Sequence, residues 1–134
     1  MIRSADEFYR LRTSSDPEEY GRAAREPADE AVWLEVIECY PGMREWVAYN
    51  KSVPLSILRL LATSEDWRVR VMVAMKRKLD GATFCLLAGD PDAKVRHSIT
   101  YNAKAPADVL ERLCGDKEQF VAEAARERLS ARVR

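Results

Sequence analysis

Three consecutive segments of the chain share one pattern at a constant spacing. The segments start at Met43, Val69 and Val95, and they align without gaps. Four columns carry the pattern, one of arginine and three of large apolar residues: Arg44, Arg70 and Arg96; Val47, Val73 and Ile99; Leu58, Phe84 and Leu110; Leu61, Leu87 and Leu113. A period of about 26 residues is typical of repeat architectures. The pattern therefore predicts a repeated structural unit, and a truncated fourth unit begins at Val121.

Each unit is predicted to contain two helices and no strand. Apolar residues at spacings of three and four indicate a first helix near 43–50, 69–76 and 94–102 and a second near 54–63, 80–89 and 106–115. Pro54 and Pro106 suit the first turn of the second helix, and Asp80 in the middle unit suits its N-cap. A pair of short helices cannot bury its apolar face alone, so we expect an all-α fold in which the units stack as a solenoid.

The first full unit, MREWVAYNKSVPLSILRLLATSED, resembles the leucine-rich repeat variant. The matches are Arg44, Val47, Ala48, Asn50, Pro54, Leu58, Leu61 and Ala62. The third unit repeats part of the pattern, and the middle unit departs from it at Lys76 and Asp80. The resemblance implies a short right-handed α-solenoid of the HEAT-like class, which offers binding surfaces rather than one reaction.

We expect one domain over residues 1–134. Residues 1–42 read as a degenerate N-terminal cap, 43–118 as three repeats, and 119–134 as a truncated C-terminal repeat and cap. Within the N-terminal cap, one helix is predicted to start at Asp16–Pro17 and a second to end before Pro41.

The arginine column and the acidic turns recur with the same period. We expect Arg44, Arg70 and Arg96 each to pair with an acid in the preceding turn or the neighbouring unit, because Asp66, Asp92 and Glu118 recur with the same period. Such pairs, if exposed, would contribute less than ~1 kcal/mol each. The acidic turns themselves, including Asp90, are expected to be helix caps and solvated turns.

Little in the sequence suggests catalysis. His97 is the only histidine, which nearly excludes a histidine-based metal site, and no phosphate-binding glycine motif is present. Three widely spaced cysteines favour a reducing, cytoplasmic compartment; Cys39 is expected to pack between helices, Cys85 to be partly exposed and Cys114 to be a small buried residue. No secretory signal or membrane span is visible. We therefore expect no enzyme, no cofactor, no metal and no membrane partner.

Charge is balanced overall but unevenly distributed. The chain has 22 basic and 22 acidic residues, while residues 1–40 hold ten acids and five bases. A global attraction to nucleic acid is therefore absent.

A local basic edge is still predicted, because cations fall in the same inter-helix loop of successive units. Two tyrosines lie beside them, so the candidate partner-binding residues are Lys51, Lys76, Arg77, Lys78, Lys104, Tyr49 and Tyr101. The opposing interpretation is that the neighbouring Asn50 and Asn102 only bond loop backbone and that the aromatic residues only pack.

We predict a protein that binds another protein with an acidic surface. By analogy with small cytoplasmic solenoids, the more specific hypothesis is an immunity or inhibitor protein that neutralises a toxin. The alternative is a nucleic-acid-binding HEAT-like module, since cations with aromatic residues also suit nucleic acid.

Overall fold

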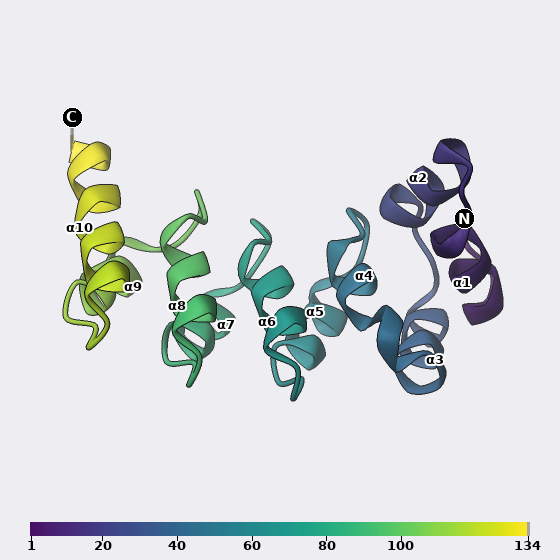
Figure 1. Ribbon diagram of the computed structural model, residues 1–134, viewed down its shortest axis with the longest axis horizontal. Helices are drawn as coiled ribbons and strands as arrows, with labels where there is room; N and C mark the ends of the chain where they lie inside the picture. The colour runs from purple at the N-terminus through teal and green to yellow at the C-terminus, as the bar shows by residue number, and fades with distance from the viewer. Residues whose placement is uncertain (134) are drawn as a thin grey trace. The chain divides into compact units, whose positions relative to one another are not determined.

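The computed structural model describes residues 1–133, and these residues are all-helical, as the sequence predicts (Figure 1). Within them the one β-type pairing is an isolated bridge between Ile2 and Ala28. The chain divides into two compact units, Met1–Leu61 and Ala62–Arg134, which are described separately.

The first unit contains five α-helices and a short 3-10 helix. They are α1 (Ala5–Thr13), α2 (Pro17–Arg25), α3 (Glu30–Cys39), η1 (Pro41–Met43), α4 (Arg44–Tyr49) and α5 (Leu55–Leu61). Helix α1 packs against α2 and α3, and α3 packs against α4 and α5. The Trp33 ring meets the Phe8 ring edge-on, with centroids 5.3 Å apart, and both side chains are fully buried.

The second unit consists of α6 (Trp67–Ala74), α7 (Gly81–Ala88), α8 (Ala93–Thr100), α9 (Ala107–Leu113) and α10 (Gln119–Val133). Helix α8 packs between α6 and α10, while α7 and α9 pack behind them against α8 and α10 (Figure 1). Most of these helices have seven or eight residues, too few to be stable alone, so tertiary packing must stabilise them.

The three apolar columns of the sequence pattern contribute to the buried cores of the two units. All nine residues of these columns are buried: Val47, Val73, Ile99, Leu58, Phe84, Leu110, Leu61, Leu87 and Leu113. The predicted helices lie within two residues of those observed for most units, since the same spacing that marks a buried face also marks a helix.

Aspartates begin several of the helices. Asp66 caps α6 and Asp92 caps α8, each accepting a hydrogen bond from the backbone N–H two residues on. Asp80 caps α7 through the N–H of Thr83, as predicted. Each cap satisfies a backbone donor that would otherwise have no partner at the helix start.

Arg70 and Arg96 pair with acids, as expected, but their partners are not the recurring acids Asp66, Asp92 and Glu118. Arg70 donates from Nε and Nη2 to Asp90, at 2.7 and 3.1 Å. Arg96 binds Asp116 in the same way, at 2.7 and 3.2 Å. Neither pair is exposed, because the two side chains of the second pair are only 7% and 6% accessible and those of the first pair are similarly covered. The estimate for exposed pairs therefore does not apply to them, and the expectation that Asp90 lies in a solvated turn was wrong, because Asp90 is buried.

Arg70 and Arg96 also donate to a backbone carbonyl in the turn before their own helices. Nη1 of Arg70 donates to the carbonyl of Ser64, and Nη1 of Arg96 donates to the carbonyl of Asp90, both at 2.7 Å. Arg44 instead donates from Nε to the carbonyl of Ile37. The acid candidates Asp66 and Asp92 instead cap helices α6 and α8.

Two helices differ from the sequence expectation. Helix α1 was not predicted, although Ser4 and Glu7 form the capping signature of a helix start, with the Glu7 N–H donating to Ser4 Oγ at 3.0 Å. At the other end, α10 is one continuous helix over Gln119–Val133, so the expected truncated repeat and cap are not separate helices.

The pKa of Asp116 is lowered by its ion pair with Arg96. Burial disfavours its ionised form, but the hydrogen bonds from Arg96 and from the Glu118 N–H outweigh burial and lower the pKa of Asp116. The hydrogen bond to Asp116 raises the pKa of Arg96. Asp116 therefore stabilises the fold above its unfolded pKa of about 3.9, and this contribution is lost as the pH falls through the lower folded pKa.

We expect Asp116→Asn to lower the free energy of unfolding by roughly 3 kcal/mol at neutral pH, because Arg96 would be left buried without its countercharge. Urea denaturation followed by circular dichroism measures this change. The difference from the wild type should narrow as the pH falls below about 4 and should vanish below the lower folded pKa of Asp116, where the folded wild-type carboxyl is also protonated.

The matched control is Glu111→Gln, which removes one carboxylate from an exposed position of α9. It should change the free energy of unfolding by less than about 0.5 kcal/mol. Equal effects of the two substitutions would show that the Arg96–Asp116 pair is not a principal support of the fold.

Candidate functional site

One edge of the second unit is formed by two inter-helix loops, 75–80 and 101–106, and by the C-terminal half of α10 (top of the unit in Figure 1). The buried side chain of Asn102 holds the loops side by side. Its Nδ2 donates to the carbonyls of Ala74 and Lys76, at 2.8 and 2.6 Å, while its Oδ1 accepts from the N–H of Lys104. The structure thus brings together two of the predicted basic loops.

Helix α10 adds two arginines to this edge. Arg128 Nε donates to the carbonyl of Thr100 at 3.0 Å. Arg132 donates to the carbonyls of Ala103 and Ala105, at 3.2 and 2.7 Å. We define the basic edge as the six cations that these loops and α10 place there: Lys76, Arg77, Lys78, Lys104, Arg128 and Arg132.

Most of the basic edge is not neutralised by acids of the chain. Within residues 1–133, five of its cations form no ion pair with a carboxylate: Arg77, Lys78, Lys104, Arg128 and Arg132. The two arginines are held by backbone carbonyls, which restrict their positions but leave their charge uncompensated. The edge can therefore attract an anionic surface.

Tyr101 stands beside the cations with 63% of its surface exposed. The guanidinium carbon of Arg128 lies 5.6 Å from the centre of the Tyr101 ring. His97 contacts the same ring, with centroids 4.9 Å apart, and also contacts Phe120. The aromatic residue predicted for this edge is thus exposed rather than packed in the core.

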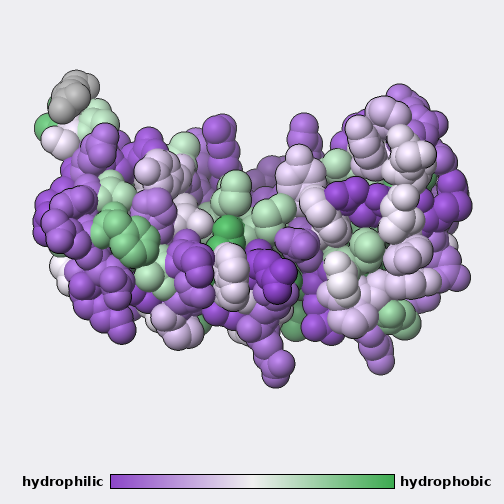
Figure 2. Space-filling model, viewed as in Figure 1, coloured by the Kyte–Doolittle hydropathy of each residue, from purple (hydrophilic) through white to green (hydrophobic). Residues whose placement is uncertain are grey.

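The surrounding face of α6, α8 and α10 is mainly hydrophilic, with small hydrophobic patches (Figure 2). Its exposed aromatic residues include Phe120 and Trp67, and Lys94 Nζ lies 4.4 Å from the centre of the Trp67 ring. Aromatic residues are enriched in the contact surfaces of proteins, so this face adds to the area that a partner can cover.

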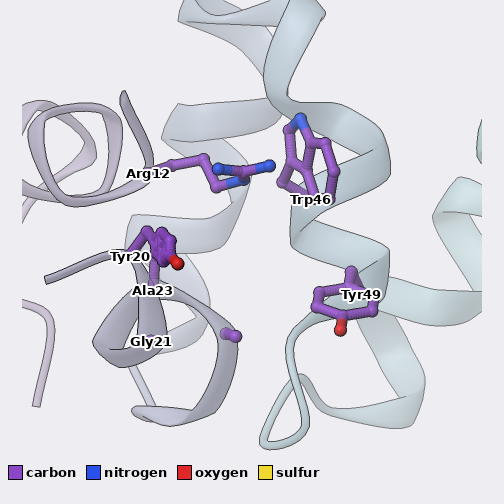
Figure 3. Close-up of a pocket in the computed structure, with 7 residues that line it drawn as sticks. Arg12, Tyr20, Gly21, Ala23, Trp46 and Tyr49 are labelled. Carbon is purple, nitrogen blue, oxygen red and sulfur yellow. The ribbon is translucent and has the colours of Figure 1, made fainter. Parts of the chain in front are cut away.

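Two predicted site residues, Tyr49 and Lys51, belong to the first unit, and both are exposed there. Tyr49 lines a pocket with Arg12, Tyr20 and Trp46 (Figure 3). Asn50 binds the carbonyls of Ala23 and Glu26, just as Asn102 binds its own neighbouring loop. The structural interpretation of the asparagines is therefore confirmed.

Sequence reasoning missed Arg128 and Arg132. A usable signal was present, because Arg128 lies one repeat period after Asn102. Both side chains donate to the carbonyl of the helix residue 28 positions earlier, Thr100 for Arg128 and Ala74 for Asn102. Arginine in place of asparagine keeps the donor and adds a charge.

In the part of the chain that the structure describes, the cysteines and other potential metal ligands do not form a site. Within residues 1–133, no cluster of three or more potential metal ligands is found, and no helix is long and apolar enough to cross a bilayer. Cys85 is exposed, as predicted, and Cys114 is only partly buried. Cys39 is exposed, so its expected packing between helices was wrong.

Comparison of the chain with protein-family models, with curated proteins and with solved structures finds no match.

We expect Asn102→Asp to destabilise the second unit by roughly 2 kcal/mol, because a carboxylate would face the carbonyls of Ala74 and Lys76 where an amide now donates. Urea denaturation measures the loss. Lys104→Gln, in the same loop but exposed, should change the free energy of unfolding by less than about 0.5 kcal/mol. Unchanged stability of Asn102→Asp would mean that Asn102 does not hold the loops together.

Proposed function

We propose that the protein is a short right-handed α-solenoid that binds an acidic surface of another protein and has no enzymatic activity of its own. The observation that carries the proposal is the basic edge, whose arginines Arg128 and Arg132 are held by carbonyls without being neutralised. Complementary charge of this kind mainly speeds association and selects the partner.

The solenoid form of the proposal rests on equivalent contacts that lie one repeat period apart. Arg70 with Asp90 and Arg96 with Asp116 are one such set. Asn102 with Ala74 and Arg128 with Thr100 are another. Contacts that recur between successive helix pairs are what a stack of repeats requires.

A protein partner is favoured over nucleic acid by the charge of the unit. Residues 62–134 contain 14 basic and 11 acidic residues, a formal net charge of only +3. Nucleic-acid-binding domains are usually strongly basic. Arginine with exposed tyrosine is also typical of the residues that dominate protein–protein binding energy. The specific role that we propose is that of an immunity or inhibitor protein, whose partner would be a toxin.

The second candidate function is nucleic-acid binding. Its specific support is Tyr101, which is largely exposed and lies under the Arg128 guanidinium, as an aromatic residue that stacks on bases would. The two functions predict different partners for the same edge, so one set of variants can separate them.

We expect the triple variant Lys76→Glu, Arg77→Glu, Lys78→Glu to slow association with the protein partner by roughly tenfold at low salt, because charge reversal removes the steering field. The partner would be captured from extracts of the source cells and purified, and association rates would be measured by surface plasmon resonance.

The matched control reverses three exposed cations of the same unit that lie off the basic edge, with Arg68→Glu, Lys117→Glu and Arg126→Glu. It changes the net charge equally and should leave the rate close to that of the wild type. Equal slowing by both triple variants would remove the basic edge as the contact. Gel-shift titration with single-stranded and duplex DNA and RNA should show no binding at low salt; binding that only the edge variant abolishes would replace the protein partner with nucleic acid.

A further inference from the structure

The first unit contains a pocket of about 340 Å³ between α2 and α4, near the end of α1 (Figure 3). Its volume lies within the range of about 300–1,000 Å³ typical of small-molecule sites. Tyr20 and Gly21 lie on one side, Trp46 and Tyr49 lie on the other, and the Arg12 side chain reaches across toward Trp46. Two further lining residues, Ala23 and Ala24, are small.

The pocket walls present aromatic rings. Trp46 and Tyr49 meet edge-on with centroids 5.8 Å apart, and Tyr49 and Tyr20 remain 48% and 39% exposed. Opposite them, small residues at Gly21, Ala23 and Ala24 leave room that larger side chains would fill. A flat apolar group can therefore enter the pocket and stack on or meet the edge of these rings.

Arg12 provides the charge. Its guanidinium carbon lies 3.6 Å from the centre of the Trp46 ring, and the residue is half-buried. Three other arginines of the same unit each have a carboxylate partner: Arg10 with Glu19, Arg22 with Glu26 and Arg25 with Glu18. Arg12 differs from them, because within residues 1–133 its guanidinium has neither a carboxylate nor a carbonyl partner.

We propose that this pocket binds a small aromatic carboxylate, with the ring between the aromatic walls and the carboxylate on Arg12. A planar guanidinium that is already oriented by stacking on Trp46 can bind a carboxylate through two parallel N–H···O hydrogen bonds. The proposal concerns a second site and does not depend on the basic edge or its partner.

The surrounding charge restricts the ligand further. Residues 1–61 carry 8 basic and 11 acidic residues, a formal net charge of −3. A ligand with several negative charges, such as a nucleotide, would be repelled by this excess, whereas one carboxylate matches the one unpaired cation of the pocket. A cationic ligand is disfavoured as well, because Arg12 already covers the face of Trp46.

An aromatic group with a nearby carboxylate occurs in two kinds of ligand, a free aromatic acid and the C-terminal residue of a peptide. The probes are 3-phenylpropionate for the first and the tripeptide Gly-Gly-Phe for the second. The matched probes are 3-phenylpropionamide and the amidated tripeptide, which keep the ring and lose the charge. Binding is measured by calorimetry and by the NMR signal of the Trp46 indole N–H, assigned with Trp46→Phe.

We expect both carboxylates to shift the Trp46 signal and the amides to bind at least roughly tenfold more weakly, since the charge-assisted pair is lost. Arg12→Met should abolish this preference for the carboxylate, and Arg12→Lys should restore it only in part. Arg10→Met, which removes a neighbouring cation outside the pocket, should bind as the wild type does.

The Trp33 and Phe8 resonances verify that each variant is folded, because these two rings form the core of the unit. Tighter binding of the tripeptide would identify a peptide C-terminus as the ligand class, and tighter binding of phenylpropionate would identify a free acid. Equal binding of acids and amides, unaltered binding by Arg12→Met, or no binding up to the solubility limit would overturn the proposal.

Discussion

The second unit depends on a buried guanidinium that joins two turns. Arg96 on α8 binds the carbonyl of Asp90 in the turn before its helix and the carboxylate of Asp116 in the turn after α9. Helices of seven or eight residues have little stability of their own, so such links decide whether they stay packed. Because the charge is buried, the pair cannot be half-formed without leaving an uncompensated ion.

The two edges of the second unit differ in the acceptors that their basic and amide side chains meet. At the edge of the acidic turns, the arginines form ion pairs with aspartates, as Arg70 does with Asp90. At the basic edge, the links are made by Asn102, Arg128 and Arg132 to backbone carbonyls. A carbonyl holds a cation without cancelling its charge, so Arg128 and Arg132 keep their positive charge at that edge. The difference in charge between the two edges thereby follows from the kind of acceptor, carboxylate or carbonyl, that each donor binds.

Arg12 in the first unit follows the same logic. Residues 1–40 contain twice as many acids as bases, ten against five, and yet this guanidinium stacks on Trp46 rather than pairing with a carboxylate. Its neighbour Arg10 does find Glu19. A step of two positions along a helix separates Arg10 and Arg12 by about 200°, which turns them to different faces of α1. The excess of acidic residues in this part of the sequence therefore does not determine which group Arg12 contacts.

The sequence by itself determined that the chain is helical, where the apolar columns lie and which aspartates begin helices, because these features depend on spacings of three or four residues and on local backbone donors. Helix α1 could also have been predicted from Ser4 and Glu7. Only the tertiary structure decided that Asp90 and Asp116 bind the arginines, that Arg132 joins the basic edge and that Arg12 lines a pocket. Those partners lie on different helices or turns, and the packing of the helices sets the distances between them.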